Sequence, residues 1–508
     1  MKKFHKYFYS ISLFLIIISF IATAIYFRSS INNAFITPDE TVNYTSLITF
    51  AKTFNFKVEN KYSLNDNFTI VRPRGLSLNG KYLVPSKYFG MSFFYGFAYI
   101  FIKEYVRYIT PIIGGVGILI MYHFVMLITS NKKTALLSAF LLAFFPPYFW
   151  WSRFSYMENI FGVVLFFFSF YLLTFFLKNK TPKYLFYASF FLGISCWVRP
   201  DYSVFVIAPL SIFLVFYYKE IGIKKLLLSA VIFSLTIMPV FIYNISLYGK
   251  AFTTGTHYAL RMTALGPLGL KIRSLTTLGT NFENTLIKVC NLFIFSFIGL
   301  LIFIKKRNNY FNKFGIPYLF FAIGGTAIIS YILLSGTPPV ADIIIDESYT
   351  RYYLPLYLCI LPGLSILITR LPKKIKLLTI ISYLFFSFFF LSSQLKYVLP
   401  VTRAYAKTKE NILKNTEINS IIFIDGLDKI LYPDRHVASI SLSESGNISQ
   451  TVINTIINLI KYDKTTPIYI YKNSNRIDLL YITKQLQNND ISLNQTANTL
   501  LYKITINN

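Results

Sequence analysis

The apolar and polar positions along the chain follow the pattern of a protein with many membrane-spanning helices. A helix needs about 20 apolar residues to cross a bilayer, because the hydrocarbon core is about 30 Å thick. Eleven runs approach or exceed this length, some with the help of flanking aromatic residues: 7–27, 107–129, 134–150, 159–177, 184–198, 203–218, 226–247, 286–304, 314–334, 353–369 and 377–395. We therefore predict an all-α polytopic membrane core of about 11 transmembrane helices.

Two segments allow an alternative. The first run could be a signal peptide, since Ala22-Thr23-Ala24 resembles a cleavage site, but it is longer than the apolar stretch of a typical signal peptide and we expect a retained helix. Residues 88–102 are apolar but short and contain two glycines, which suits an interfacial or re-entrant helix.

Composition supports a membrane protein. The 508 residues are 54% apolar and only 14% charged, whereas soluble domains carry about 25% charged residues. Disorder, a collagen-like fibre, a disulfide-stapled secreted domain and a cytosolic enzyme are therefore excluded. The net charge of +29 would suggest nucleic acid in a soluble protein. Here the basic residues flank the spans, so we read them as topology signals and expect no nucleic-acid partner.

The distribution of these basic residues fixes the predicted orientation. If 88–102 does not cross, the N-terminus and the connections on its side hold 19 lysines and arginines against a single acid, Glu220. Positive residues concentrate on the cytoplasmic side. We therefore expect a multi-pass protein of the cytoplasmic membrane with a cytoplasmic N-terminus, and a crossing by 88–102 would reverse every later loop and break the rule.

Three larger pieces then lie outside: 28–106, 248–285 and the tail 397–508. The tail loses the phenylalanine-rich runs and contains strand-like stretches at 421–424 and 468–471, with a helix-like stretch at 476–488. We predict a core at 1–396, whose first outer loop 28–106 carries interfacial helices, and a small extracytoplasmic α/β domain at 397–508.

The candidate chemistry lies at the outer surface, because the spans contain almost no titratable groups besides His123. Asp39 and Glu40 follow Pro38 just beyond the first span, at the start of a helix-like stretch. Acids at a helix start interact favourably with the helix dipole, so they could be a capping pair. They could also be catalytic.

Cations surround these acids in the predicted topology. Arg72, Arg74 and Lys87 share their loop, and other outer loops carry Arg153, Arg199 and Arg351. Arginine and lysine bind phosphate, and a carboxylate can take a proton from an incoming hydroxyl. The set suits a reaction on a lipid-linked phosphate.

The order of these features resembles a known family. It includes Asp39-Glu40 with Tyr44, Pro85 before an aromatic segment, Phe145-Pro146-Pro147, Trp151-Ser152-Arg153 with Glu158, Gly193 with Arg199-Pro200, Asn244 with Gly249-Lys250, and Arg351-Tyr352-Tyr353 with Pro355. Over roughly residues 7–395 the chain is similar to the GT-C membrane glycosyltransferases, in the branch of protein O-mannosyltransferases and lipid A aminoarabinose transferases.

The resemblance implies transfer of a sugar from a polyprenyl- or dolichyl-phosphate carrier to a lipid, glycan or protein acceptor on the outer face, with inversion. It implies that Asp39 is the catalytic base. It also implies that Glu40 either helps to hold the acceptor or supports Asp39. Glu158 matches a second acidic position of the family, although it could also be an acidic helix start.

The resemblance assigns phosphate binding to Arg351 with the neighbouring Tyr352, although the pair could instead anchor the chain at the membrane interface. Arg199 could join the phosphate site or pair with Asp201. Lys87 follows Pro85, whereas the aminoarabinose enzymes have a basic residue before this proline, so its assignment departs from the family pattern.

We expect no required cofactor. The acids Asp342, Asp346 and Glu347 could suggest a divalent metal, but their spacing matches no defined motif and we read them as a solvated loop.

Two other functions on lipid-linked saccharides remain open, besides that of a membrane scaffold that presents the 397–508 domain. A transporter or flippase of lipid-linked saccharides would show two related halves and polar groups at the midplane, which the sequence does not. A glycan polymerase or ligase would carry a large late outer loop, whereas 335–352 is short.

Overall fold

The computed structural model describes residues 2–28, 33–62, 68–200, 217–253, 255, 298, 351, 354–443, 448–497 and 500–506. These residues form two compact units, each described by itself below. Unit 1 comprises Met1–Arg28, Arg107–Ile242 and Ala264–Tyr397. Unit 2 comprises Ser29–Val106, Tyr243–Thr263 and Val398–Asn508.

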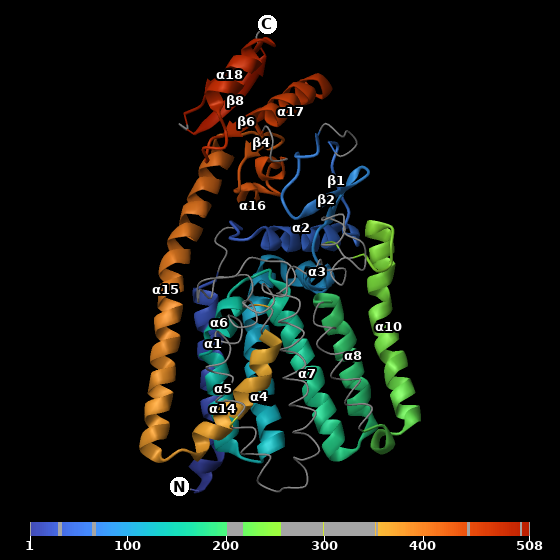
Figure 1. Ribbon diagram of the computed structural model, residues 1–508, viewed down its shortest axis with the longest axis vertical. Helices are drawn as coiled ribbons and strands as arrows, with labels where there is room; N and C mark the ends of the chain where they lie inside the picture. The colour runs from blue at the N-terminus through green and yellow to red at the C-terminus, as the bar shows by residue number, and fades with distance from the viewer. Residues whose placement is uncertain are drawn as a thin grey trace, which may run out of the picture. The chain divides into compact units, whose positions relative to one another are not determined.

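Unit 1 is a bundle of long apolar helices. They are α1 (Lys2–Tyr26), α4 (Ile109–Thr129), α5 (Lys132–Ala143), α6 (Pro146–Ser152), α7 (Glu158–Asn179), α8 (Pro182–Val198), most of α10 (Ile223–Tyr248), α14 (Leu354–Arg370) and the first part of α15 (Lys373–Lys414). Helices α4, α5, α7 and α8 run alongside one another, with contacts of α4 to α5 and α7 and of α7 to α8 (Figure 1).

Five helical stretches in the described part of the chain are long and apolar enough to cross a membrane: Tyr7–Tyr26, Gly90–Thr129, Glu158–Asn179, Ile223–Tyr248 and Lys373–Lys414. The pair α5 and α6 makes a sixth if its two helices form one span, with a bend of 60°. The bend falls at Phe145, before Pro146, because proline disfavours helical backbone at the preceding residue.

The protein is therefore a helical multi-pass membrane protein, as the sequence predicts. The spans expected at 203–218, 286–304 and 314–334 lie largely or wholly outside the described residues. The number eleven stays a prediction.

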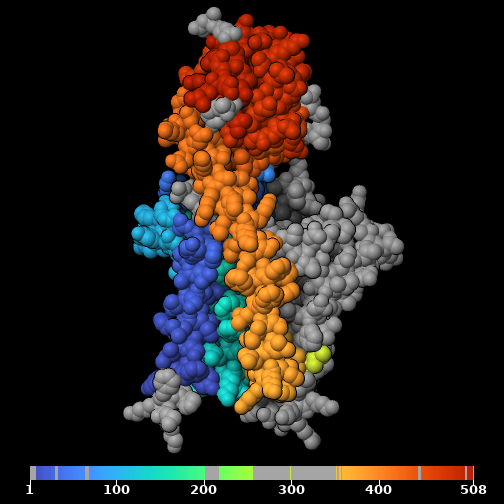
Figure 2. Space-filling view, turned by 90° about the vertical axis from the view of Figure 1, so that its left-hand side faces the viewer, coloured from blue at the N-terminus to red at the C-terminus, as the bar shows by residue number. Residues whose placement is uncertain are grey.

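Large apolar side chains cover the outside of unit 1. Figure 2 shows α1 and the first part of α15 on one face, where Phe14 is 62% exposed and Phe388 is 74% exposed. In a soluble protein such a surface would aggregate, whereas contact with lipid tails removes it from water. The exposed apolar face is therefore the lipid-facing one.

The interior of unit 1 is closely packed around glycines of α4. The buried Tyr148 hydroxyl on α6 donates a hydrogen bond of 2.8 Å to the Gly114 carbonyl oxygen. A Cβ at Gly117 would lie 2.1 Å from the same hydroxyl and 2.8 Å from a Val164 methyl. Only a residue without a side chain fits there.

We expect Gly117→Ala to lower the free energy of unfolding by about 1–3 kcal/mol, because overpacking a tight interior costs that much. Thermal unfolding in detergent measures the effect. In the Gly117→Ala background, Tyr148→Phe removes the clashing oxygen and should restore part of the loss. An unchanged unfolding temperature for Gly117→Ala would contradict this packing.

Unit 2 begins with two helices and a small sheet. Helix α2 (Pro38–Thr53) contacts α3 (Gly90–Ile102), which a short 3₁₀ segment, η2 (Lys103–Tyr108), follows. Strands β1 (Val58–Glu59), β2 (Leu76–Asn79) and β3 (Tyr82–Pro85) pair antiparallel in the order β1-β3-β2. The β2–β3 turn contains Gly80 at φ +55°, a conformation that glycine adopts without strain.

Helix α3 corresponds to the ambiguous segment 88–102. Its 13 residues span about 20 Å, less than the hydrocarbon core. Phe101 at its end is 81% exposed. The short length agrees with the predicted interfacial helix, although the orientation toward the membrane stays a prediction.

The C-terminal part of unit 2 is a mixed sheet with helices. It consists of β4 (Ile421–Ile424), α16 (Asp428–Leu431), β5 (His436–Ser439), η3 (Ile440–Leu442), α17 (Ile448–Tyr462), β6 (Ile468–Tyr471), α18 (Leu479–Gln487), β7 (Ile491–Gln495) and β8 (Leu501–Ile506). The strand order is β5-β4-β6-β8-β7, with β4 parallel to both β5 and β6 and the other pairs antiparallel.

Alternation along β4 gives this sheet two cores. Ile421 and Phe423 pack with residues of α17 and α18, whereas Ile422 and Ile424 pack with residues of α15 and α16. Successive side chains of a strand point to opposite faces, so a fully apolar strand is buried on both sides. The predicted strands 421–424 and 468–471 are confirmed as β4 and β6.

The division of the chain differs from the linear one expected at residue 396. The loop 29–106 folds in the same unit as 398–508. Residues 397–414 are helical, as the end of α15, so the first strand of the tail begins only at Ile421.

Candidate active site

The N-terminus of α2 carries the acidic pair. Thr37 is the N-cap, and its hydroxyl accepts a hydrogen bond of 3.2 Å from the Glu40 backbone N–H. Pro38 occupies the first turn, where its missing N–H has no helical partner to lose. Glu40 is fully buried, and its Oε2 accepts from the Ile36 backbone N–H at 3.3 Å. The capping alternative is therefore realised for Glu40.

Asp39 has a different environment. Its carboxylate lies 3.3 Å from the Lys87 ammonium, with side chains that are 14% and 25% exposed. Asp39 and Lys87 are thus a partly accessible ion pair, in which one group accepts protons and the other attracts anions. Of the predicted cations in loop 28–106, Lys87 is the one for which the structure records an ion pair with Asp39.

Close backbone packing holds Lys87 in place. The Tyr248 hydroxyl donates to the Pro85 carbonyl oxygen at 2.8 Å, and the Ser77 and Ser86 hydroxyls lie 2.7 Å apart. A Cβ at Gly255 would lie 2.4 Å from the Pro85 oxygen and 2.7 Å from the Lys87 nitrogen. Glycine at 255 lets this segment approach the backbone that carries Lys87.

The C-terminal part of unit 2, residues 398–508, is called the C-terminal subdomain below. It supports the other side of the acidic loop, which is the segment 33–40 that leads into α2. Lys429 of α16 donates to the Ile36 carbonyl oxygen, and the Thr41 hydroxyl donates to the Lys429 carbonyl oxygen at 2.9 Å. Burial, together with the nearby Arg74 guanidinium, lowers the pKa of Lys429 to about 8. No local sequence signal identifies Lys429, because it lies 393 residues from Ile36 along the chain.

Arg74 and Arg72, both predicted to bind phosphate, contact protein groups. Arg74 donates from its backbone N–H and its Nε to the buried Asp428 carboxylate, at 2.6 and 2.8 Å. Arg72 donates to the carbonyl oxygens of Thr69 and Leu76, and burial lowers its pKa. The structure thus gives both arginines a role in holding the loop together.

Tyr44 connects α2 to the start of η2. Its hydroxyl accepts from the Asn33 side chain at 3.0 Å, and burial, with the Glu104 carboxylate nearby, raises its pKa. Glu104 also accepts from the Tyr99 hydroxyl at 3.0 Å. Tyr44 is buried, so its hydrogen bond from Asn33 helps to fix the position of α2.

A second pair of predicted residues meets within unit 1. Glu158, the first residue of α7, lies 3.5 Å from an Arg199 nitrogen, and the two side chains are only 3% and 2% exposed. The same Arg199 nitrogen donates to the Asn159 side chain. Removing one partner of such a buried ion pair strongly destabilises the folded protein, because it leaves the other charge buried and unpaired. The pairing with Asp201 cannot be compared, since Asp201 lies outside the described residues.

Two further predicted residues, Arg153 and Arg351, lie in unit 1 as well. Arg153 is fully buried, with its guanidinium 3.7 Å from the Trp150 ring centre and 4.7 Å from that of Phe154. Arg351 is partly buried. Tyr352, Asp342, Asp346 and Glu347 lie outside the described residues.

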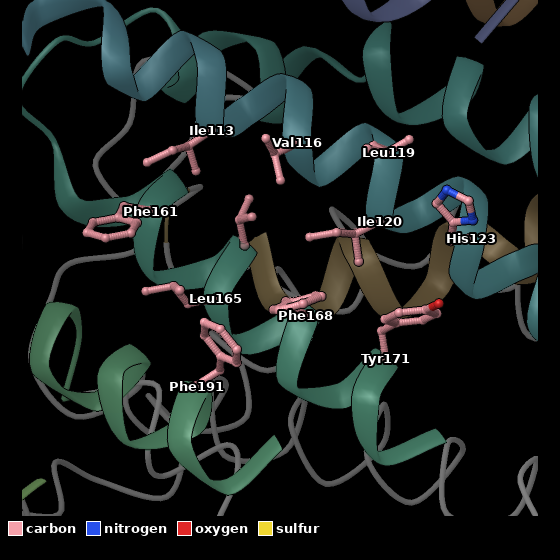
Figure 3. Close-up of a pocket in the computed structure, with 11 residues that line it drawn as sticks. Ile113, Val116, Leu119, Ile120, His123, Phe161, Leu165, Phe168, Tyr171 and Phe191 are labelled. Atoms are coloured by element: carbon pink, nitrogen blue, oxygen red, sulfur yellow. The ribbon is translucent and has the colours of Figure 1, made fainter. Parts of the chain in front are cut away.

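An apolar pocket of about 390 Å³ opens between α4, α7 and α8 (Figure 3). Ile113, Leu165 and Phe191 are among its lining residues, and His123 is its one ionisable group besides Tyr171. Such a lining suits hydrocarbon, not the transfer of protons or phosphate. In the described part of the chain, no three histidine, cysteine or acidic side chains are grouped to hold a metal ion.

Fold and site together define a class: a multi-pass helical membrane protein with a carboxylate and an amine paired in its second unit. The family described as dolichyl-phosphate-mannose-protein mannosyltransferase matches residues 93–243. No curated protein sequence matches the chain.

Two crystal structures of ArnT from Cupriavidus metallidurans share the fold. The structure bound to undecaprenyl phosphate has a TM-score of 0.64 at 10% identity, with 98% of each chain covered. The apo state has a TM-score of 0.62 at 9% identity, with 97% of each chain covered. The chain therefore shares the fold of these two structures over nearly its whole length, which is the fold that the sequence resemblance implies.

The lowered pKa of Lys429 predicts a pH dependence of stability. The folded chain releases this proton near pH 8, whereas the unfolded chain keeps it up to pH 10.5, so the unfolded state binds more protons in between. Stability from this group therefore increases as the pH rises through that window. We expect the unfolding temperature of wild type, relative to Lys429→Met, to increase between pH 7.5 and pH 9.5.

Lys503→Met is the matched control. Lys503 pairs with Glu417 at 2.9 Å, and this contact raises its pKa, so it stays charged throughout the window. The difference in unfolding temperature between Lys503→Met and wild type should not change with pH. If the difference between Lys429→Met and wild type is also constant, the lowered pKa of Lys429 is contradicted.

Proposed function

We propose that the protein is a membrane glycosyltransferase that moves a sugar from a polyprenyl- or dolichyl-phosphate carrier to an acceptor hydroxyl. The observation that carries this is the Asp39 carboxylate 3.3 Å from Lys87, in a chain with a GT-C fold. One of the two similar ArnT structures is bound to undecaprenyl phosphate. That ligand motivates the same class of carrier here.

In the proposed reaction, the acceptor oxygen attacks the anomeric carbon of the sugar from the side opposite the phosphate. Asp39 takes the hydroxyl proton as the new bond forms. The bond from the anomeric carbon to the phosphate oxygen breaks, and the lipid phosphate leaves with the electron pair. The sugar configuration inverts.

Lys87 fits two tasks in this reaction. Its positive charge balances the Asp39 carboxylate at 3.3 Å, and it offers a charge-assisted hydrogen bond to the departing phosphate. Phosphate is a good leaving group, so one carboxylate suffices where glycosidases need two. We propose that Lys87 supplies the positive charge at Asp39 and that no metal is required.

The wider assignments belong to the proposal as well. We propose eleven spans with the N-terminus in the cytoplasm, which places unit 2 and the acceptor outside the cytoplasmic membrane. Glu40 then supports Asp39 through the helix cap. Glu158, Arg153, Arg199, Arg351 and Tyr352 stay candidate residues for the carrier or the acceptor.

Asp39→Asn tests the base. The amide keeps the size of the side chain but cannot accept the proton, so kcat for transfer from a polyprenyl-phosphate sugar should decrease by roughly 10²–10⁴-fold. Glu59→Gln is the matched control, because its carboxylate is 76% exposed in the same loop. Unchanged transfer by Asp39→Asn would remove Asp39 from the mechanism.

Lys87→Met tests the phosphate contact. Loss of a charge-assisted hydrogen bond should increase KM for the lipid carrier and lower kcat, with a combined loss in kcat/KM of about tenfold or more. Lys87→Arg should recover part of it, and Lys81→Met, 55% exposed, should behave as wild type. Equal kinetics for Lys87→Met and wild type would argue against a role in carrier binding.

A further inference from the structure

The carboxyl ends of β4, β5 and β6 carry a group of polar side chains that the proposed reaction does not use. Asp425 follows β4 directly, Ser441 lies two residues beyond β5, and Asn473 lies two residues beyond β6. Because these strands are parallel, their carboxyl ends meet at one edge of the sheet.

The topology makes this edge a favourable place for a ligand. The chain runs from β4 to β5 on one side, and then crosses to β6 on the other side of β4. Loops leaving neighbouring strands in opposite directions open a crevice, and doubly wound α/β sheets bind their ligands at such a switch point.

Asp425 connects all three strand ends, through its carboxylate and its backbone. The Ser441 hydroxyl donates to Asp425 Oδ1 at 2.6 Å. The Asn473 side chain accepts from the Asp425 backbone N–H at 3.2 Å and donates to its carbonyl oxygen. An Arg476 nitrogen lies 3.7 Å from Asp425 Oδ1. Both side-chain contacts of this carboxylate involve Oδ1, so Oδ2 has capacity for another donor.

The same edge is open on the solvent side. The Arg476 side chain is 60% exposed. Gly426 turns the chain at φ +70°, and a Cβ built there would meet nothing within 4 Å. The exposed Arg476 guanidinium therefore lies beside the mostly buried Asp425 carboxylate.

This chemistry favours a neutral ligand with several hydroxyls. A hydroxyl both donates and accepts, so adjacent hydroxyls match a carboxylate beside a guanidinium. The charges of Asp425 and Arg476 balance, and a phosphate would meet a carboxylate as well as a cation. Saccharides fit this site better than phosphates.

We propose that the edge formed by Asp425, Ser441, Asn473 and Arg476 binds a saccharide portion of the acceptor. This inference rests on the proposed transferase function and deepens it, since it gives the C-terminal subdomain a role in acceptor recognition.

An array of defined oligosaccharides immobilised on glass tests the proposal. Wild type, Arg476→Met, Asp425→Asn, Asp39→Asn and Lys503→Met are applied as full-length protein in detergent. Lys503→Met is matched, because it also removes the cation of an exposed ion pair in this subdomain. Wild type, Lys503→Met and Asp39→Asn should retain the same glycans, whereas Arg476→Met and Asp425→Asn should bind them about tenfold or more weakly.

Retention of no glycan by wild type, or equal binding by Arg476→Met, overturns the proposal. Arg476 is mostly exposed, so its variant stays informative even where Asp425→Asn unfolds. Transfer assays separate the two proposals: undiminished transfer by Asp39→Asn contradicts the mechanism without changing glycan retention.

Discussion

The cost of placing a charge in hydrocarbon organises this protein. A titratable group at the middle of a bilayer costs about 2.5–3.5 kcal/mol on insertion scales. The helices of unit 1 accordingly expose phenylalanine and leucine, and the buried Glu158 and Arg199 lie against each other. Most of the acidic residues that the structure describes lie in unit 2, where Asp39 and Lys87 form a partly exposed ion pair.

Within unit 2, two adjacent acidic residues, Asp39 and Glu40, have different surroundings. Asp39 and Glu40 are adjacent in the sequence and sit in the same helical turn. Glu40 is fully buried and accepts from Ile36, whereas Asp39 is partly exposed beside Lys87. The cap restrains the turn and leaves one of the two carboxylates partly exposed.

The support for that turn comes from segments far away in the chain. Gly255 packs on the backbone of Lys87, and Lys429 holds the carbonyl oxygen of Ile36. Arg74 joins the same loop to Asp428 at the start of α16. The C-terminal subdomain is therefore part of the scaffold around the acidic loop, in addition to any ligand it binds.

The sequence by itself determined the elements that depend on residues close together along the chain. Run length predicts apolar helices, uniformly apolar short runs predict β4 and β6, and Pro38 with two acids predicts the start of α2. The same local information leaves both capping and catalysis open for Asp39 and Glu40. It also misses Lys429 and ends the last span before Lys396, although α15 continues to Lys414. Only the tertiary structure decided that Glu40 caps α2, that Lys429 contacts Ile36 and that α15 continues to Lys414, because packing selects partners that lie hundreds of residues apart and short-range patterns carry no information about them.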